Sequence, residues 1–317
     1  MTNKNKQIYR RHTIARVSLK LALVLGLAQV FLTSYAQELE PRAYSNTPIG
    51  MNFLLAGYGY SEGSLLFDPS VPIQGANANV DVGVFAFAHS LAVADKSAKI
   101  GVLLPYVDLY ANGFLEGEYR ERKVSGFADP TFAFTINLSG APALTLKDFR
   151  QYRQNTIIGA TVKITAPFGQ YDPDRLINIG TNRWVLKPEI GISKALGYWI
   201  VEGAAAVSLY NNNDDFFGGQ KLEQDPIYSV QGHVVYNFRP ALWAALDSTY
   251  YTGGRTTVNG VQKDNKLKNW RTGFTLTAPI NKYNSIKLAS SSGISTRTGT
   301  DFTAYLLAWQ YRWGGGL

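Results

Sequence analysis

The chain has 317 residues, contains no cysteine and carries a formal charge of +8 at pH 7. Six basic residues and no acidic residue fall within the first 36 positions, so the remainder carries only +2 and offers no reason to predict nucleic-acid binding. The lack of cysteine excludes a disulfide framework. Beyond residue 36 no apolar run is long enough for a transmembrane helix, which excludes an ordinary α-helical membrane protein.

The first 36 residues have the three parts of an export signal. Basic residues occupy 1–20, and the run LALVLGLAQVFL at 21–32 is almost wholly apolar. Ser34 and Ala36 then place small residues at the two positions that a signal peptidase reads. Since the apolar run is too short to span about 30 Å of hydrocarbon as a helix, we predict a signal peptide at 1–36, cleaved near Ala36, and a short periplasmic lead-in at 37–49.

Alternation of apolar and polar residues then predicts antiparallel β-strands. In the clearest example, Ile158, Val162 and Ile164 alternate with Thr161 and Lys163. A period of two means that one face of the strand is apolar and the other polar. Strands are predicted before it at 50–60, 80–94, 99–109 and 127–138, with a long loop at 61–79, a turn at 95–97 and a charged loop at 110–125.

The segment 139–154 breaks this pattern, because its apolar residues do not alternate. It predicts either a short amphipathic helix at the membrane interface or a longer turn. Eight strands follow, at 156–166, from Trp184 to a turn at 195–197, and at 199–210, 227–238, 241–251, 267–280, 283–295 and 302–313. Further short turns are predicted at 239–240 and 281–282, and long polar loops at 170–182, 211–225 and 252–265, the last with an Asn259-Gly260 turn signal.

Twelve strands, joined mostly by short turns at one end and long loops at the other, are typical of a closed transmembrane barrel. We therefore predict an all-β fold, a single antiparallel barrel over 50–317 with short periplasmic turns and long extracellular loops. A secreted β-sandwich or a soluble barrel would share the composition but would not need aromatic girdles at strand ends. The residues predicted for these girdles are Trp184, Trp199, Tyr210, Trp243, Tyr250, Tyr251, Trp270, Tyr311 and Trp313.

The polar faces of the strands identify side chains that should point into the barrel. A charge facing lipid near the midplane would cost about 2–4 kcal/mol, so the charged face must line the interior. These side chains could form a narrow polar conduit, or they could pair with one another and fill the lumen. The predicted lumen-lining residues are Asp129, Lys163, Lys187, Glu189, Glu202, Gln231, His233, Asp247, Arg271 and Lys287.

Two polar loops hold further candidates. They could gate the mouth, bind a divalent cation through oxygen ligands, or hold an aromatic solute between Phe216 and Phe217; solvated turn residues are the simpler interpretation. No spacing typical of a metal-binding loop is present, and we predict no metal and no cofactor. The loop candidates are Asp172, Asp174, Asp214, Asp215, Phe216 and Phe217.

An enzyme is not predicted. A lipid hydrolase would need a histidine within hydrogen-bond reach of a serine nucleophile. Beyond residue 36 the histidines are His89 and His233, and Ser229, on the same strand face as His233, is four residues away and too far for direct contact.

Several long stretches resemble one family closely, the MetA-pathway of phenol degradation family of outer-membrane β-barrel transporter proteins. The stretches are GFADP (126–130), GAPALTLKDFRQYRQ (140–154), TAPFGQYDPDRLINIGTNRW (165–184), NNDDFFGG (212–219), the run 224–251 leading into YYTGGRTT (250–257), STRTGTDF (295–302) and AWQYRWGGGL (308–317). They cover nearly the whole chain beyond the predicted signal. The resemblance implies the barrel, and the family's name implies a link to the breakdown of aromatic compounds.

Together, the barrel and the resemblance predict a channel for passive uptake of small, aromatic or hydrophobic compounds in the outer membrane of a Gram-negative bacterium. The alternative is a structural or surface-interaction barrel with a filled lumen and no transport. The expected partners are outer-membrane lipid, a small hydrophobic or aromatic solute and the outer-membrane assembly machinery, and no nucleic acid. Either Trp313 or Leu317 would serve as the C-terminal signal read by that machinery.

Overall fold

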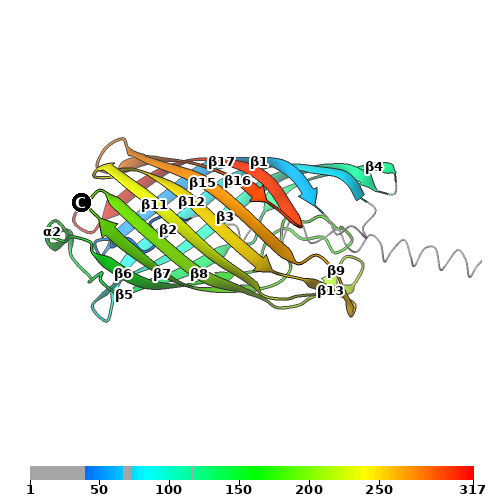
Figure 1. Ribbon diagram of the computed structural model, residues 1–317, viewed down its shortest axis with the longest axis horizontal. Helices are drawn as coiled ribbons and strands as arrows, with labels where there is room; N and C mark the ends of the chain where they lie inside the picture. The colour runs from blue at the N-terminus through cyan, green and yellow to red at the C-terminus, as the bar shows by residue number, and fades with distance from the viewer. Residues whose placement is uncertain (1–39, 67–72, 116) are drawn as a thin grey trace, which may run out of the picture.

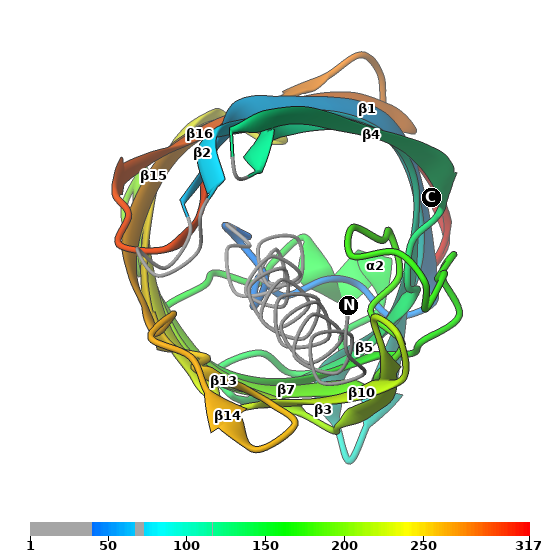
Figure 2. The same ribbon diagram turned by 90° about the vertical axis from the view of Figure 1, so that its right-hand side faces the viewer.

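The computed structural model describes residues 40–66, 73–115 and 117–317, so the predicted signal peptide lies outside the described residues. The described residues form a closed antiparallel barrel with twelve strand positions (Figures 1 and 2). β4 and β5 share one position because both pair with β3, and β1 closes the ring by pairing with both β2 and β17. The wall strands are β1 (Met51–Leu66), β2 (Ile73–Val93), β3 (Lys96–Leu115), β4 (Glu118–Phe127), β5 (Thr131–Ser139), β6 (Thr156–Thr165), β7 (Val185–Leu196), β8 (Trp199–Tyr210), β11 (Ile227–Arg239), β12 (Leu242–Gly253), β15 (Leu267–Pro279), β16 (Asn284–Ser295) and β17 (Gly299–Gly314).

The strands are apolar outside, and those of one side of the barrel are polar inside. On β7, Leu186, Ile190 and Ile192 are exposed, whereas Lys187 and Glu189 are buried. This is the reverse of a water-soluble protein, and it is stable where lipid surrounds the barrel and the charged groups find partners inside it. The predicted all-β barrel of twelve strands is therefore confirmed.

Aromatic side chains form clusters on the outer surface at both ends. Near the end that holds the C-terminus (Figure 1), the rings of Trp199 and Tyr236 lie 4.7 Å apart. Near the other end the rings of Tyr250 and Trp270 lie 5.0 Å apart. Such clusters suit the two membrane interfaces, where an apolar ring can carry a polar edge.

Three of the predicted girdle residues do not belong to these clusters. Tyr251 is fully buried. The guanidinium of Arg183 lies over the ring of Tyr210 at 4.5 Å, and the guanidinium of Arg42 lies over the ring of Trp243 at 5.4 Å. The girdle prediction was wrong for these three, because position near a strand end does not say which face a ring occupies.

The predicted loops at 61–79 and 110–125 were also wrong in part. β1 and β2 extend into the first, and β3 and β4 extend through most of the second. At the tops of these strands the inner face packs into a buried apolar cluster that includes Leu65, Ala78 and Leu109, so the apolar-out, polar-in alternation that marks a membrane strand is lost there. The hairpin formed by β3 and β4 projects at the end opposite the C-terminus (Figure 1).

The loops at 211–225 and 252–265 fold into a small sheet instead of remaining irregular. Its strands, in spatial order, are β14 (Val261–Gln262), β13 (Thr256–Val258), β10 (Gln220–Gln224) and β9 (Asn213–Phe216). The predicted Asn259-Gly260 turn is confirmed, since it joins β13 to β14 with φ of 47° and 78°. Both values lie in the left-handed region that a two-residue hairpin of this type requires.

Segment 139–154 is a turn that contains a single helical turn, α2 (Leu146–Phe149). The Thr145 hydroxyl caps its start by accepting a hydrogen bond from the backbone N–H of Asp148. α2 lies beside the barrel at the end that holds the C-terminus (Figure 1). None of the helices in the described residues is long and apolar enough to cross a membrane.

Candidate functional site

A segment that precedes the first strand occupies the barrel interior. Residues 40–49, the described part of the predicted lead-in, contact side chains of the inner wall on strands far apart in sequence. We call these residues the tail. The backbone N–H of Gly50 donates to Ser90 O at 2.8 Å, which fixes the tail where it joins β1. The tail was expected in the periplasm, and no alternation of its residues indicated a partner inside.

Two inner-wall glutamates hold the tail. The Tyr44 hydroxyl donates to Glu189 Oε1 at 2.8 Å, and the backbone N–H of Arg42 donates to Glu202 Oε2 at 2.6 Å. The Lys99 ammonium donates to Ala43 O at 2.5 Å. Hydrogen bonds in which one partner is charged stabilise by about 1.5–3 kcal/mol each, so these contacts together keep the tail seated.

The Tyr44 ring fits between two glycines of the wall. Only 3% of Tyr44 is exposed. A Cβ atom at Gly159 or at Gly191 would overlap the ring, and the first of these sites is on β6 and the second on the neighbouring β7. Glycine is needed here for space, since neither residue has a positive φ.

Gly191→Ala is therefore expected to unseat the tail. Overpacking costs about 1–3 kcal/mol, which would lower the ratio of seated to released tail by roughly 5- to 150-fold. Single-channel conductance in planar bilayers measures the released state directly. Gly203→Ala, on the outer face with space for a Cβ, is the matched control.

A Gly191→Ala conductance equal to that of Gly203→Ala would contradict this account. The double variant Gly191→Ala/Tyr44→Ala should conduct no more than Tyr44→Ala alone, because the overlap that Gly191→Ala creates is with the Tyr44 ring.

The tail also carries a carboxylate to the lysines of the wall. Glu40 Oε2 lies 2.7 Å from Lys163 Nζ. Glu40 precedes the first strand, and the Lys163 ammonium lowers the pKa of its carboxyl to about 2, with smaller contributions in the same direction from Lys287 and Lys99. Half of the glutamate side chain is open to the lumen while the lysine is mostly buried. The pair is thus an ion pair at neutral pH.

A second group of titratable side chains lies on neighbouring strands. His233 Nδ1 lies 2.7 Å from Asp247 Oδ1, and the Thr275 hydroxyl donates to Asp247 Oδ2 at 2.9 Å. His233 is also directly opposite Glu202 in the pairing of β11 with β8, and Ser193 Oγ donates to Glu202 Oε1. The acids of this group are therefore satisfied by partners within the protein.

The inner wall opposite this group is apolar. On β2 the small residues Val80, Val82 and Val84 alternate with the exposed, outward Phe85 and Phe87. Together with β1, β3 and β17, β2 forms an apolar side of the lumen, whereas β6 to β15 form a charged one. Val82 and Leu306 line one side of a cavity of about 250 Å³, and Asp247 and Thr275 line the other.

The extracellular mouth is covered by residues 166–184, the loop between β6 and β7. Ile177 and Ile179 pack against a buried apolar cluster of β1 to β4 that includes Leu109. Asp129 holds the base of the loop, because its carboxylate accepts hydrogen bonds from the backbone N–H of Gly169 and from the N–H and hydroxyl of Thr181, all between 2.7 and 2.8 Å. Burial raises the pKa of Asp129, and these hydrogen bonds oppose the shift.

The structure places the predicted lumen residues in three ways. Lys163, Glu189, Glu202 and Gln231 meet the tail or its partners. Arg271 donates to Ser291 Oγ at 3.0 Å and to Phe302 O at 2.9 Å, which ties three neighbouring strands together on the inside. Asp129 lies between strands and binds the loop. The remaining predicted residues, on inward positions of their strands, are Lys187, His233, Asp247 and Lys287.

The loop candidates do not form one site. Asp172 caps a turn by accepting from the backbone N–H of Asp174 at 3.0 Å, and Asp214 and Asp215 are exposed on β9. Phe216 is buried against Leu222, Val258 and Leu176 and so stabilises the small sheet. Phe217 packs against the same cluster and also lines a cavity of about 360 Å³ with Leu65, Ala111, Phe114 and Ile177 among its walls.

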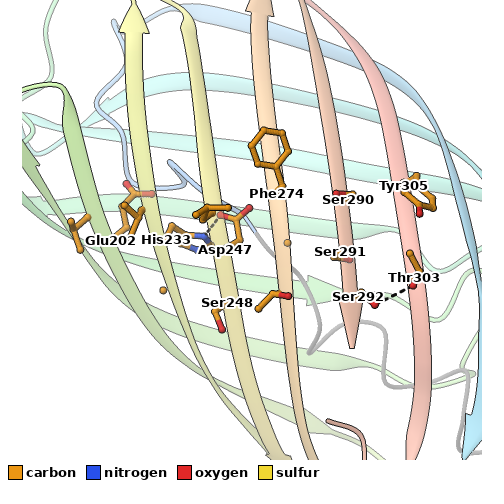
Figure 3. A pocket seen from close by; sticks show the side chains of 16 residues that line it. Glu202, His233, Asp247, Ser248, Phe274, Ser290, Ser291, Ser292, Thr303 and Tyr305 are labelled. Carbon is orange, nitrogen blue, oxygen red and sulfur yellow. Dashed lines mark hydrogen bonds and ion pairs between the residues drawn. The ribbon is translucent and has the colours of Figure 1, made fainter. Parts of the chain in front are cut away.

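Another hollow, of about 770 Å³, lies on the outer surface over β8 to β17 (Figure 3). The exposed side chains of Leu246, Phe274 and Tyr305 border a row of small residues that includes Gly232 and Ser248. Because exposed apolar side chains line it and His233 and Asp247 are buried behind it, this hollow faces the membrane and is separate from the lumen.

Enzyme-like patterns find no supporting geometry. The pattern G-x-S-x-G occurs at 59–63, but it lies inside β1, which is paired on both sides, whereas a nucleophile elbow needs a sharp strand-to-helix turn. In the part of the chain that the structure describes, no three His, Asp or Glu side chains gather as a metal site would require.

Comparison with known families then identifies the barrel. The family model described as Putative MetA-pathway of phenol degradation matches residues 63–310. The chain belongs to this family. The search of curated proteins found no match.

Solved structures support the same fold. The COG4313 outer membrane channel from Pseudomonas putida F1 superposes with a TM-score of 0.75 at 22% identity, covering 87% of this chain and 100% of the other. The beta domain of the Bordetella autotransporter BrkA superposes with a TM-score of 0.52 at 9% identity, covering 83% of this chain and 100% of the other. At these identities the likeness concerns the fold.

Several residues of the lumen escaped the sequence analysis. Lys99 lies on a strand whose faces the sequence did not settle, although a charge on a membrane strand must face the interior. Glu40, Arg42 and Tyr44 belong to a segment without periodicity, so no signal in the sequence could place them. The apolar inner face of β2 was missed because Asp81 and His89 lie on its other face and made that face look like the inward one.

Proposed function

We propose that the protein is a channel for passive uptake of small hydrophobic, mainly single-ring aromatic compounds across the outer membrane. The observation that carries this proposal is the apolar side of the lumen. A dry cavity of about 150 Å³ is enough to bind benzene, and the cavity between Val82 and Asp247 measures about 250 Å³. Polar groups on its other side would orient a hydroxyl.

The extracellular cavity supports the same proposal. Its lining combines apolar side chains such as Phe217 and Ile177 with charged ones such as Arg122, and it borders the loop that covers the mouth. An apolar compound arriving from outside would meet this cavity before the lumen. Aromatic walls favour aromatic ligands through offset or edge-to-face contacts worth about 0.5–1.5 kcal/mol.

One observation favours the second candidate, a barrel with a filled lumen and no transport. The seated tail occupies the interior between β6, β7 and β8. Transport therefore requires either a path beside the tail or its displacement.

Solute flux into liposomes that contain the refolded protein tests the proposal. We expect phenol to enter faster than a sugar of similar size, after subtraction of leakage through empty liposomes. Leu306→Asn should reduce phenol flux about tenfold, because a polar group without a partner in an apolar site costs about 1–3 kcal/mol. Equal flux of phenol and sugar would indicate a general pore, and flux no greater than in empty liposomes would favour the filled barrel.

We also infer that export uses the signal at 1–36, with cleavage after Ala36, and that the outer-membrane assembly machinery inserts the barrel. Residues 37–49 would then begin the exported chain. Sequencing the N-terminus of protein purified from outer membranes checks the cleavage position, and a start other than residue 37 would revise it.

A further inference from the structure

Two lysines of the inner wall face each other across neighbouring strands. Lys163 on β6 is directly opposite Lys187 on β7, and both point into the lumen. Like charges at directly opposite positions repel and are destabilising. Two carboxylates offset this repulsion: Glu40 of the tail lies 2.7 Å from the Lys163 ammonium, and Glu189 is two residues from Lys187 on the same inward face of β7.

A third lysine approaches from the opposite side of the barrel. Lys287 lies on β16, six strand positions around the ring from β6. Its charge nevertheless stabilises the ionised Glu40 carboxylate, and so does that of Lys99 on β3. The Glu40 carboxylate is thus held by direct contact with Lys163 and by the longer-range charges of Lys287 and Lys99, a positively charged environment suited to an anion.

The acidic residues nearby are already engaged. Glu189 accepts hydrogen bonds from Tyr44 and from Gln231, and Asp247 is paired with His233 and Thr275. Among the acidic side chains of this part of the lumen that the structure describes, Glu40 is on the tail and can leave with it, whereas Glu189 and Asp247 belong to the wall. Its departure would leave the lysines of the wall with one negative charge fewer.

The apolar cavity is next to Lys287. Lys287 and the cavity residue Ala289 are two residues apart on the same face of β16. Ala289 is directly opposite Leu306 on β17, which also lines the cavity. An apolar body in the cavity would therefore place an attached acidic group near the ammonium groups.

We propose that Lys163 and Lys287, with Lys187 directly opposite Lys163, provide an anion subsite, that Glu40 pairs with Lys163 of this subsite while the tail is seated, and that the cargo is a small apolar compound bearing a carboxylate, which replaces Glu40. This inference rests on the proposed uptake function and narrows its substrate class. It also explains how a cargo could release the tail, because the two carboxylates compete for the same lysines.

Binding of benzoate to the detergent-solubilised exported chain, measured by isothermal titration calorimetry, tests the subsite. Benzyl alcohol, of similar size but neutral, is the comparison ligand. In Glu40→Gln the competing carboxylate is gone, so the Kd for benzoate should fall about fivefold. In Lys163→Met it should rise about tenfold, the equivalent of one charge-assisted hydrogen bond.

Lys194→Met is the matched control, because Lys194 is only half-buried and its ammonium contacts Asn155 outside this cluster. Heat-modifiable mobility in gels shows whether each variant is folded. If Lys163→Met does not fold, Glu40→Gln still decides, since Glu40 is not part of the wall.

Benzoate binding that is unchanged in Glu40→Gln, or no tighter than that of benzyl alcohol, would overturn the subsite. Liposome flux separates this result from the uptake proposal. If phenol crosses the membrane but benzoate binding does not change in Glu40→Gln, the uptake proposal is supported and the anion-subsite proposal is wrong. If the variants change benzoate binding as expected but no solute crosses the membrane, the anion-subsite proposal is supported and the uptake proposal is wrong.

Discussion

Deletion of residues 37–46 from the exported chain is expected to raise single-channel conductance by about an order of magnitude. A twelve-stranded barrel is wider than the eight-stranded barrels that side chains fill and narrower than the sixteen-stranded barrels that leave an aqueous channel, so removal of the tail should open a pore. These residues include Glu40, Arg42 and Tyr44, whose contacts reach β6, β7 and β8. Residues 47–50 are retained because Gly50 N–H and Ile49 N–H donate to Ser90 O and Leu144 O and anchor the start of β1. Conductance in planar bilayers measures the effect.

A tail of the same length made only of Gly and Ser is the matched control for this deletion. It preserves chain length but lacks the carboxylate, the ring and the guanidinium that contact the wall. We expect it to conduct nearly as well as the deletion. A Gly/Ser tail that keeps the channel closed would show that bulk alone, and not the specific contacts, fills the lumen.

Asp129→Ala is expected to release the loop 166–184 while leaving the barrel intact. The buried carboxylate accepts three hydrogen bonds, two from backbone N–H groups and one from the Thr181 hydroxyl. Each such bond to a charged group is worth about 1.5–3 kcal/mol. Loss of even one of these hydrogen bonds would raise the fraction of molecules with an open loop by about 10- to 100-fold.

Limited trypsin digestion of the folded protein measures this opening, since Arg175 lies in the loop and its side chain is exposed. Cleavage after Arg175 should accelerate in Asp129→Ala and less in Asp129→Asn, which keeps one oxygen acceptor. Asp214→Ala, at an exposed position of β9, should cleave at the original rate. Equal rates for all of these proteins would mean that the apolar contacts of Ile177 and Ile179 hold the loop without Asp129.

The wall strands were predictable wherever lipid surrounds them. Residues such as Ile190 and Ile192 must contact hydrocarbon, and Lys187 and Glu189 must avoid it, so the sequence alternates strictly. The prediction failed where that constraint ends, at the tops of β1 to β4 and in the small sheet of β9, β10, β13 and β14. There water or protein meets both faces, and alternation carries no information.

The lumen shows the same division between local and long-range information. The inward position of Glu202 or His233 follows from its neighbours in sequence. That Glu202 binds the backbone of Arg42, 160 residues away, depends on where the tail runs, and nothing in the tail's own sequence indicates it. Gly159 and Gly191 likewise look like ordinary strand glycines until the Tyr44 ring is placed against them.

By itself, the sequence determined the all-β class, the count of twelve strands and the charged inner face, because each follows from the two-residue period and from the cost of placing a charge in lipid. Only the tertiary structure decided what fills the interior. Closure of the ring brings β6 opposite β16, turns an apolar face of β2 toward the charged wall and surrounds Glu40 with lysines. These contacts join residues that are far apart in the chain, and no local pattern encodes them.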